Sequence, residues 1–215
     1  RWYWPGHGVR LGASLVLFLS RLAPTPSDGL GFASEGWRAA IIDDASGDPS
    51  TWNLRLVAST TAPAGINAGA AIVREGETLV SLAVREPGDH AGYLVRWQAP
   101  NLLAGNLELA EWWTDDDWNS QVVLAGHLAA VLPDAGPESS LHWEPLRNQW
   151  VHLRSDGFGA TTIVASYASA LIGPWSSPKF LFRPPESDRA DAFVYAGRAH
   201  PEQDAGGALA VTYAA

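Results

Sequence analysis

Glu138 is the acidic residue of this sequence that is best placed for a chemical role. It comes directly before the run SSLHWEPLRNQWVHL, residues 139–153, which brings His142 and Trp143 close to it along the chain. A carboxyl group that is partly buried against aromatic rings has a raised pKa and can donate a proton near neutral pH. The alternative interpretation is that Glu138 is an ordinary solvated acid after the turn at residues 134–137. The two interpretations differ in what surrounds the side chain, so the elements of the fold must be placed first.

His7 and His200 are the histidines whose positions suggest a role in a site. His7 follows the tripeptide WPG, and His200 lies in VYAGRAHPE, residues 194–202. An imidazole can hydrogen-bond a hydroxyl group or titrate near neutral pH, so either residue is a candidate for acid–base chemistry. No His-x-His pair or carboxylate cluster accompanies His200, and one histidine does not make a metal site. A buried, hydrogen-bonded histidine is the alternative interpretation of His200.

Three further polar segments are interpreted as structural. The Gly-Asp-His sequence that contains Asp89 and His90 is an ordinary turn between strands. The acidic run at residues 115–117 cannot place three consecutive side chains around one cation. The stretch GFGATT, residues 157–162, has neither a lysine nor a following helix, so it is not a phosphate-binding loop.

Composition excludes several classes of partner. The chain has 215 residues, 47% of them hydrophobic, with a formal net charge of −9, which disfavours nucleic acid and anionic membrane surfaces. It contains no cysteine, so disulfides and thiol chemistry are excluded. No apolar run is long enough to span a membrane, and no signal peptide is visible. Because the sequence begins at Arg1 and contains no methionine, we expect that both ends were cut from a longer protein.

The hydrophobic pattern is that of a β protein. Eight runs are rich in Val, Leu, Ile, Tyr and Phe and are bounded by Gly, Pro, Asp and Ser. They are residues 15–22, 39–43, 78–86, 92–98, 149–155, 161–169, 179–183 and 208–214. The segment 101–113 can form a helical turn, but Gly105 and Asn106 interrupt it.

These strands repeat with a period near 60 residues. Four similar strands begin at Leu15, Leu79, Val151 and Leu209, with separations of 64, 72 and 58 residues. A tryptophan beside an acidic or proline-containing turn recurs at positions 52, 113 and 175, with separations of 61 and 62. About four strands fit into each period, and four-stranded units that repeat around an axis are the blades of a β-propeller. A β-sandwich with coincidental spacing is the alternative.

We therefore expect an all-β fold that forms a single propeller domain, incomplete at both ends. The expected blades are residues 1–65, 66–125 and 126–186, with a partial blade at 187–215, which makes about three and a half blades. The tryptophans at the blade period are expected to pack between strands. The other tryptophans among the eleven in the chain remain candidates for stacking on a ligand.

Three stretches resemble a known superfamily: residues 1–19, residues 139–178 with the motif GPWSSP, and residues 193–202. The chain is similar to the five-bladed propellers of the glycoside hydrolase family 43 and 62 superfamily, and closest to the bacterial domain-of-unknown-function family 4185. The resemblance implies a polysaccharide-acting site in the funnel at one end of the propeller axis. It also implies three carboxylates, namely a base, a general acid and a second acid that tunes the pKa and orients the substrate.

The resemblance assigns the general acid to Glu138, and it expects the second acid near His7, where the sequence has no carboxylate. His7 is then a substrate contact or a sign of altered chemistry, and the base comes from a blade that precedes Arg1. A histidine of the superfamily reaches the axis, so His200 is a third candidate for the catalytic site. The resemblance implies no cofactor other than a single axial Ca²⁺, or an ordered water in its place, near His200.

Seven residues are candidates for binding a polysaccharide or oligosaccharide, because sugars stack on aromatic rings and hydrogen-bond to polar groups in such a funnel. They are Trp4, Trp37, His142, Trp143, Phe158, Tyr195 and Arg198. The expected function is that of a secreted or periplasmic glycoside hydrolase-like protein acting on an arabinan-type or other bacterial or plant polysaccharide. Two alternatives remain open: a carbohydrate-binding propeller without catalysis, and a structural or protein-interaction propeller.

Overall fold

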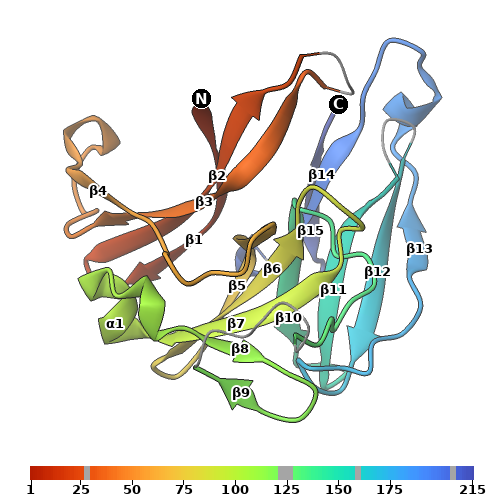
Figure 1. Ribbon diagram of the computed structural model, residues 1–215. Helices are drawn as coiled ribbons and strands as arrows, with labels where there is room; N and C mark the ends of the chain where they lie inside the picture. Colours follow the sequence, from red (N-terminus) through yellow and green to blue (C-terminus); the bar gives the residue numbers. More distant parts are fainter. Residues whose placement is uncertain (27–29, 121–127, 158–160, 204–206) are drawn as a thin grey trace.

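The computed structural model describes residues 1–26, 30–120, 128–157, 161–203 and 207–215. It consists almost entirely of antiparallel β-sheets, which follow one another along the chain (Figure 1). Within each sheet, strands that are consecutive in sequence are neighbours in space, so every sheet is a meander. The all-β expectation is confirmed, and the arrangement is that of an incomplete β-propeller.

The first two sheets have four and five strands. The first consists of β1 (Trp2–Leu11), β2 (Ser14–Pro24), β3 (Phe32–Ile42) and β4 (Leu54–Val57). The second consists of β5 (Ile66–Glu75), β6 (Thr78–Arg85), β7 (Gly92–Gln98), β8 (Glu111–Trp113) and β9 (Trp118–Asn119). A short 3-10 helix, Pro49–Thr51, precedes β4, and another, Leu107–Leu109, precedes β8.

The helical turn expected in 101–113 is the end of α1 (Ala99–Ala104), the only α-helix in the described ranges. Gly105 ends it in the left-handed conformation, and its N–H donates back to the carbonyls of Asn101 and Leu102. With six residues, α1 is far too short to cross a membrane, and none of the helices in the described part of the chain has the length and apolarity for a span.

The third sheet has four strands and the last has two. The third consists of β10 (Ser139–Glu144), β11 (Gln149–Asp156), β12 (Thr162–Ala168) and β13 (Lys179–Phe182). A 3-10 helix, Pro185–Asp188, leads to β14 (Tyr195–His200), and a further 3-10 helix, Pro201–Gln203, separates β14 from β15 (Ala210–Ala214).

Each pair of successive sheets encloses a hydrophobic layer. Phe18 of the first sheet packs on Trp97 of the second, and Trp37 meets both rings. The other face of the second sheet packs on the third through a layer that includes Leu82 and Leu141. A smaller layer holds β14 against the third sheet. Because the second sheet has a neighbour on both faces, β5 and β6 are buried along most of their length rather than at alternate residues.

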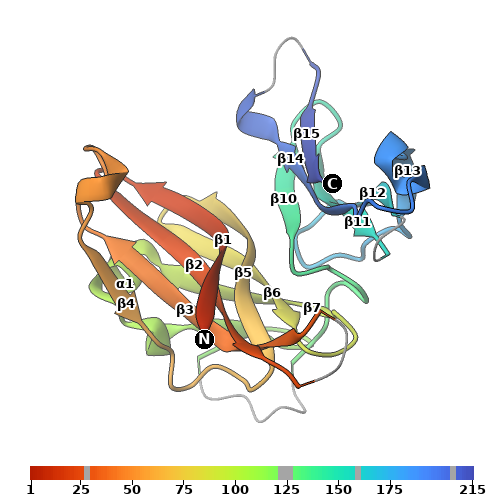
Figure 2. The same ribbon diagram turned by 90° about the horizontal axis from the view of Figure 1, so that it is seen from above.

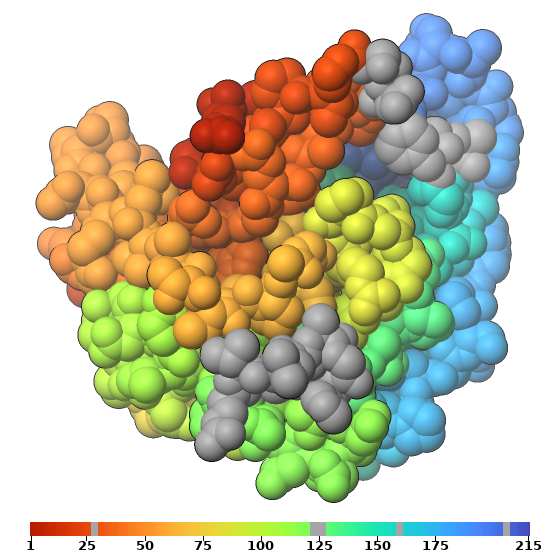
Figure 3. Space-filling view, viewed as in Figure 1, coloured from red at the N-terminus to blue at the C-terminus, as the bar shows by residue number. Residues whose placement is uncertain are grey.

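The sheets are arranged around a common central axis. Seen from above, the first strands of the sheets, β1, β5, β10 and β14, lie toward the centre, and the outer strands β4 and β13 lie at the periphery (Figure 2). In the space-filling view the colours pass around the molecule from red through green to blue (Figure 3). Each inner strand contacts the next, from β1 to β5, from β5 to β10 and from β10 to β14.

The tryptophans that recur at the blade period have packing roles. The indole N–H of Trp52 donates to the carbonyl of Gly47, and that of Trp175 donates to the carbonyl of Leu171. Trp113 packs edge-to-face on Trp118, with ring centroids 5.5 Å apart. Trp113 and Trp175 also pack against the hydrophobic layer between the second and third sheets.

Glycines let the first two inner strands approach each other closely. A Cβ atom on Gly6 of β1 would lie 2.7 Å from the carbonyl oxygen of Gly69 in β5. A Cβ atom on Gly69 would lie 2.1 Å from the Cβ atom of Phe18, and the φ of Gly69 is +103°. Each strand shifts its register at this point, so the glycines belong to β-bulges. Side chains larger than hydrogen are therefore excluded here both by space and by backbone conformation.

We expect Gly69→Ala to lower the free energy of unfolding by about 2–4 kcal/mol, because the new methyl group meets Phe18 in a backbone conformation that favours glycine. Gly76→Ala is the matched control: its φ is +62°, but a Cβ atom there would have nothing within 4 Å. The control should lose only about 1 kcal/mol. Denaturant titration of both variants measures the difference, and equal losses would contradict the steric explanation.

Candidate functional site

A cavity of about 600 Å³ lies at one end of the inner strands. It is lined by the first halves of β1, β5 and β14, by the segment before β10, and by the last residues of β2, β6 and β11. In an antiparallel sheet the start of the inner strand lies beside the end of the second strand, so these segments meet at the same end of the molecule. All four sheets contribute to the cavity.

Glu138 lines this cavity, half-buried, directly before β10. Burial raises the pKa of its carboxyl group, and the positive charge of Arg198 on β14 acts in the opposite direction. The sequence therefore predicted the position of Glu138 before an inner strand. His142 and Trp143, which were expected to surround it, lie further along β10 and are not among the cavity residues.

Asp134 supplies a second carboxylate to the cavity, in the segment before Glu138. It forms an ion pair with Arg154, with 3.1 Å between the guanidinium and carboxylate atoms. The Arg154 side chain is almost completely buried, and its other nitrogen lies 2.7 Å from Asp156. A buried guanidinium needs such partners, so the two aspartates and Arg154 form a fixed network at the cavity wall.

Glu86 is a third carboxylate of the cavity, from the turn after β6. Burial raises its pKa, and His90, 3.1 Å away, lowers it. The sequence analysis placed Asp89 and His90 in an ordinary turn and gave Glu86 no role. A signal was present, because Glu86 directly follows a second strand, and that end of a second strand lies beside the start of its inner strand.

Aromatic rings form part of the cavity wall. Trp4 of β1 is 41% exposed and packs edge-to-face on Phe32 of β3, with ring centroids 4.8 Å apart. Tyr195 of β14 is equally exposed and packs on Phe193 at 5.7 Å. All four line the cavity. Exposed flat rings beside polar groups are the surfaces on which the apolar faces of sugars stack.

Asn67 adds a polar contact at the base of the cavity. It is 6% exposed, and its Nδ2 donates to the hydroxyl oxygen of Ser34 at 2.7 Å. Its Oδ1 has no hydrogen-bond partner in the described part of the chain. A buried carbonyl oxygen without a partner is costly, so this atom has an unused capacity to accept a hydrogen bond.

His7 and His200 do not line the cavity. The Nδ1 of His7 accepts the backbone N–H of Ile72 at 3.2 Å, and burial together with the charge of Arg198 lowers the pKa of His7 to about 4. The Nδ1 of His200 lies 3.0 Å from Glu202, and its Nε2 lies 2.8 Å from the hydroxyl of Thr212. Both histidines are thus held by local hydrogen bonds near the axis.

The residues near His200 do not fit the axial Ca²⁺ that the resemblance implied. Across the described ranges there is no group of three or more His, Asp or Glu side chains that could hold a metal ion. The two ring nitrogens of His200 already have protein partners.

Trp37 does not face the cavity, so its expected role in substrate binding is corrected. It is 4% exposed and packs in the layer between the first two sheets, against Phe18 and Trp97.

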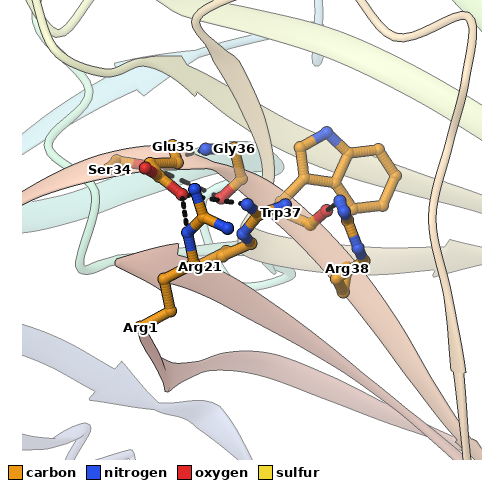
Figure 4. Close-up of polar contacts among 7 residues, drawn as sticks. All are labelled: Arg1, Arg21, Ser34, Glu35, Gly36, Trp37 and Arg38. Atoms are coloured by element: carbon orange, nitrogen blue, oxygen red, sulfur yellow. Dashed lines mark hydrogen bonds and ion pairs between the residues drawn. The ribbon is translucent and has the colours of Figure 1, made fainter. Parts of the chain in front are cut away.

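A bulge in β3 leaves Glu35 on the surface, where it contacts Arg1 at 2.9 Å and Arg21 at 3.0 Å. Figure 4 shows this ion cluster and the Trp37 indole directed away from it.

Two other expected binding residues, Trp143 and His142, are also outside the cavity. Trp143 packs edge-to-face on Trp150 at the far end of β10. His142 is 7% exposed, burial lowers its pKa, and neither ring nitrogen has a partner among the described residues. Phe158 lies outside the described residues. Of the seven expected binding residues, Trp4, Tyr195 and Arg198 line the cavity.

These features define the class of protein as an incomplete propeller with a carboxylate-lined cavity at one end of its inner strands. The chain belongs to the family described as Domain of unknown function (DUF5005), whose model matches residues 1–215. This is the matching family, rather than family 4185, and the number of blades in a complete ring stays a prediction. No curated protein matches the chain.

Solved structures similar to this chain include the following two. A protein described as "a putative hydrolase" from Bacteroides ovatus has 16% identity and a TM-score of 0.72, over 98% of this chain and 54% of that one. A variant of the GH43 protein BlXynB from Bacillus licheniformis has 12% identity and a TM-score of 0.47, over 91% of this chain and 33% of that one. The first likeness supports the fold, and the chain spans about half the length of that structure.

The lowered pKa of His7 predicts a pH dependence of stability. Between pH 6.5 and about 4 the unfolded state binds a proton at this residue and the folded state does not, so stability falls as the pH falls. His7→Asn keeps an acceptor near the Ile72 N–H and removes the titration. Between pH 7 and pH 5, wild type should lose about 2 kcal/mol more than this variant.

Urea titrations of both proteins at several pH values measure this difference. The pKa of the buried His152 is also lowered, to about 3, but that residue is present in both proteins and its effect cancels in the comparison. Parallel stability profiles for wild type and His7→Asn would contradict the prediction.

Proposed function

We propose that this protein is a glycoside hydrolase whose active site is the carboxylate-lined cavity. The observation that carries the proposal is that Glu138, Asp134 and Glu86 line one cavity of about 600 Å³ together with exposed aromatic rings. Cleavage of a glycosidic bond requires one carboxyl group that donates a proton and one ionised carboxylate that acts on the opposite face of the sugar.

Glu138 is the proposed general acid. Its half-buried position raises the pKa of its carboxyl group, so a larger fraction keeps the proton near neutral pH than in a solvated glutamate. The proton passes from this carboxyl group to the glycosidic oxygen as the bond to the anomeric carbon breaks. The leaving sugar departs as an alcohol, and Glu138 is left as a carboxylate.

Asp134 is the proposed ionised partner. Its ion pair with Arg154 fixes the orientation of the carboxylate, and Asp156 holds the other side of the same guanidinium. From the cavity wall Asp134 either activates a water molecule or attacks the anomeric carbon, and the anomeric configuration of the first product distinguishes the two routes. Glu86, paired with His90, is the proposed third carboxylate, which orients the sugar hydroxyl groups.

Trp4 and Tyr195 are the proposed stacking surfaces for sugar rings, and Asn67 is the proposed acceptor for a hydroxyl group. The hydrolase description of the Bacteroides ovatus protein agrees with this class of reaction, although at 16% identity it supports the fold alone. An arabinan-type polysaccharide is the proposed substrate, and the proposed location is outside the cytoplasm.

The test is hydrolysis of arabinan, arabinoxylan, galactan and arabinogalactan by the full-length protein. The release of reducing ends measures the rate. Glu138→Gln should lower kcat on the cleaved polysaccharide by at least about 100-fold, because the proton donor is lost. The loss should be much smaller on a 2,4-dinitrophenyl glycoside of the same sugar, whose leaving group needs no protonation. Asp134→Asn should lower the rate on both substrates.

Glu75→Gln is the control, because Glu75 is an exposed residue of β5 outside the cavity, and this variant should retain wild-type rates. Equal losses of Glu138→Gln on both substrates would contradict the role of general acid. Binding of a polysaccharide without cleavage by wild type would support a carbohydrate-binding propeller instead. Neither binding nor cleavage would contradict both functions.

A further inference from the structure

Two arginines, Arg154 and Arg198, line the cavity, and Arg198 is the one without an ion-pair partner among the described residues. It lies on β14 and lines the cavity beside Tyr195. Across the described ranges, its guanidinium group forms no hydrogen bond and no ion pair, whereas that of Arg154 has two acidic partners. A guanidinium carries five N–H donors, so all five are available to a ligand in the cavity.

The neighbouring residues of β14 fix the direction of Arg198. The N–H of Gly197 donates to the Ser155 hydroxyl at 2.9 Å, and the N–H of Ala199 donates to the Ser140 hydroxyl at 2.8 Å. Ala199 is also buried in the layer against the third sheet. Because successive side chains of a strand point to opposite faces, Arg198 is directed away from the third sheet.

A strained bulge places the side chain at the cavity. The register of β14 against β15 shifts between Tyr195 and Arg198, and Ala196 in this bulge has a φ of +54°. Bulges re-aim side chains next to functional sites, and a residue other than glycine in the left-handed region costs on the order of 1 kcal/mol or more. A Cβ atom on Gly197 would lie 2.7 Å from Ile163, so the bulge is also held by close packing.

The environment of Arg198 disfavours a lone cation. Arg198 is half-buried, and burial lowers its pKa, which means that its charge has lost part of its solvation. Glu138 is the acidic residue whose charge acts on Arg198, but the two groups form no ion pair. An anion that enters the cavity would therefore gain a charge-assisted contact that no described residue already satisfies.

We propose that Arg198 binds an anionic substituent of the substrate, a carboxylate or a sulfate ester, on a sugar residue next to Glu138. The planar fork of the guanidinium matches either group with two parallel N–H···O bonds. The inference rests on the proposed function and narrows its arabinan-type substrate to one that carries acidic substituents, as a glucuronate-containing arabinogalactan does. Since the chain has a net charge of −9, the attraction is local to Arg198 rather than a property of the whole surface.

The experiment measures the affinity of the full-length protein for pairs of glycans that differ only in the anionic group. The probes are oligogalacturonides, glucuronoxylan and glucuronate-containing arabinogalactan, each beside its carboxyl-reduced form, and sulfated galactan beside its desulfated form. Neutral arabinan completes the panel. Wild type should bind at least one charged probe about 10-fold or more tightly than its uncharged counterpart. The pair that shows the preference identifies the carboxylate or the sulfate as the group bound.

Arg198→Gln should remove this preference: affinity for the charged probe falls about 10-fold or more, and affinity for the neutral counterpart is unchanged. Arg74→Gln is the matched control, because Arg74 is an exposed arginine of β5 that pairs with Glu77 outside the cavity. Thermal unfolding confirms that both variants are folded. The control variant should retain the wild-type preference.

The outcomes separate the inference from the proposed function. If glycans are bound without a preference for charge, or if Arg198→Gln weakens charged and neutral probes equally, the role of Arg198 is overturned. The hydrolase proposal then stands wherever a glycan is cleaved. If no glycan is bound or cleaved, the proposed function fails and the inference fails with it.

Discussion

The close approach of the inner strands at Gly6 and Gly69 is the constraint on which the rest of the fold depends. Without side chains at these positions, β1 and β5 can meet at the centre, where the carbonyl of Gly69 occupies the space that a side chain on Gly6 would fill. The bulges at the same level bend the strands and increase their twist. The first two sheets can then share the layer formed by Phe18, Trp37 and Trp97.

The charged side chains of the cavity are of two kinds, those with ion-pair partners and those without such partners among the described residues. Arg154 is buried with two aspartates, an arrangement in which each charge is compensated and the side chains are fixed. Arg198 and Glu138 are half-buried and have no such partners among the described residues, so their energies depend on what enters the cavity. The Arg154 network supports the wall of the site, whereas Arg198 and Glu138 are the residues proposed for binding and chemistry.

The apolar runs and the turn residues between them were sufficient to predict an all-β chain, and the eight runs coincide with strands. The inner strands β1, β5, β10 and β14 were not among these runs. The sequence also placed Glu138, since one acid before an inner strand is a local feature. It could not place Trp37, because an alternating pattern does not say which face of a sheet meets a neighbour. Glu86 was missed because its proximity to Glu138 arises only when the second and third sheets pack together.

The cavity wall is drawn from all four sheets, and each sheet otherwise packs mainly on its neighbours in the chain. A bound ligand that spans the cavity would therefore act as a crosslink between units that are not adjacent along the chain. Its binding free energy would add to the cohesion of the whole assembly, since a ligand that binds only the folded form stabilises it. Separation of the last sheet from the first would then require release of the ligand, so occupancy of the site and the mechanical integrity of the four-sheet arrangement would be coupled.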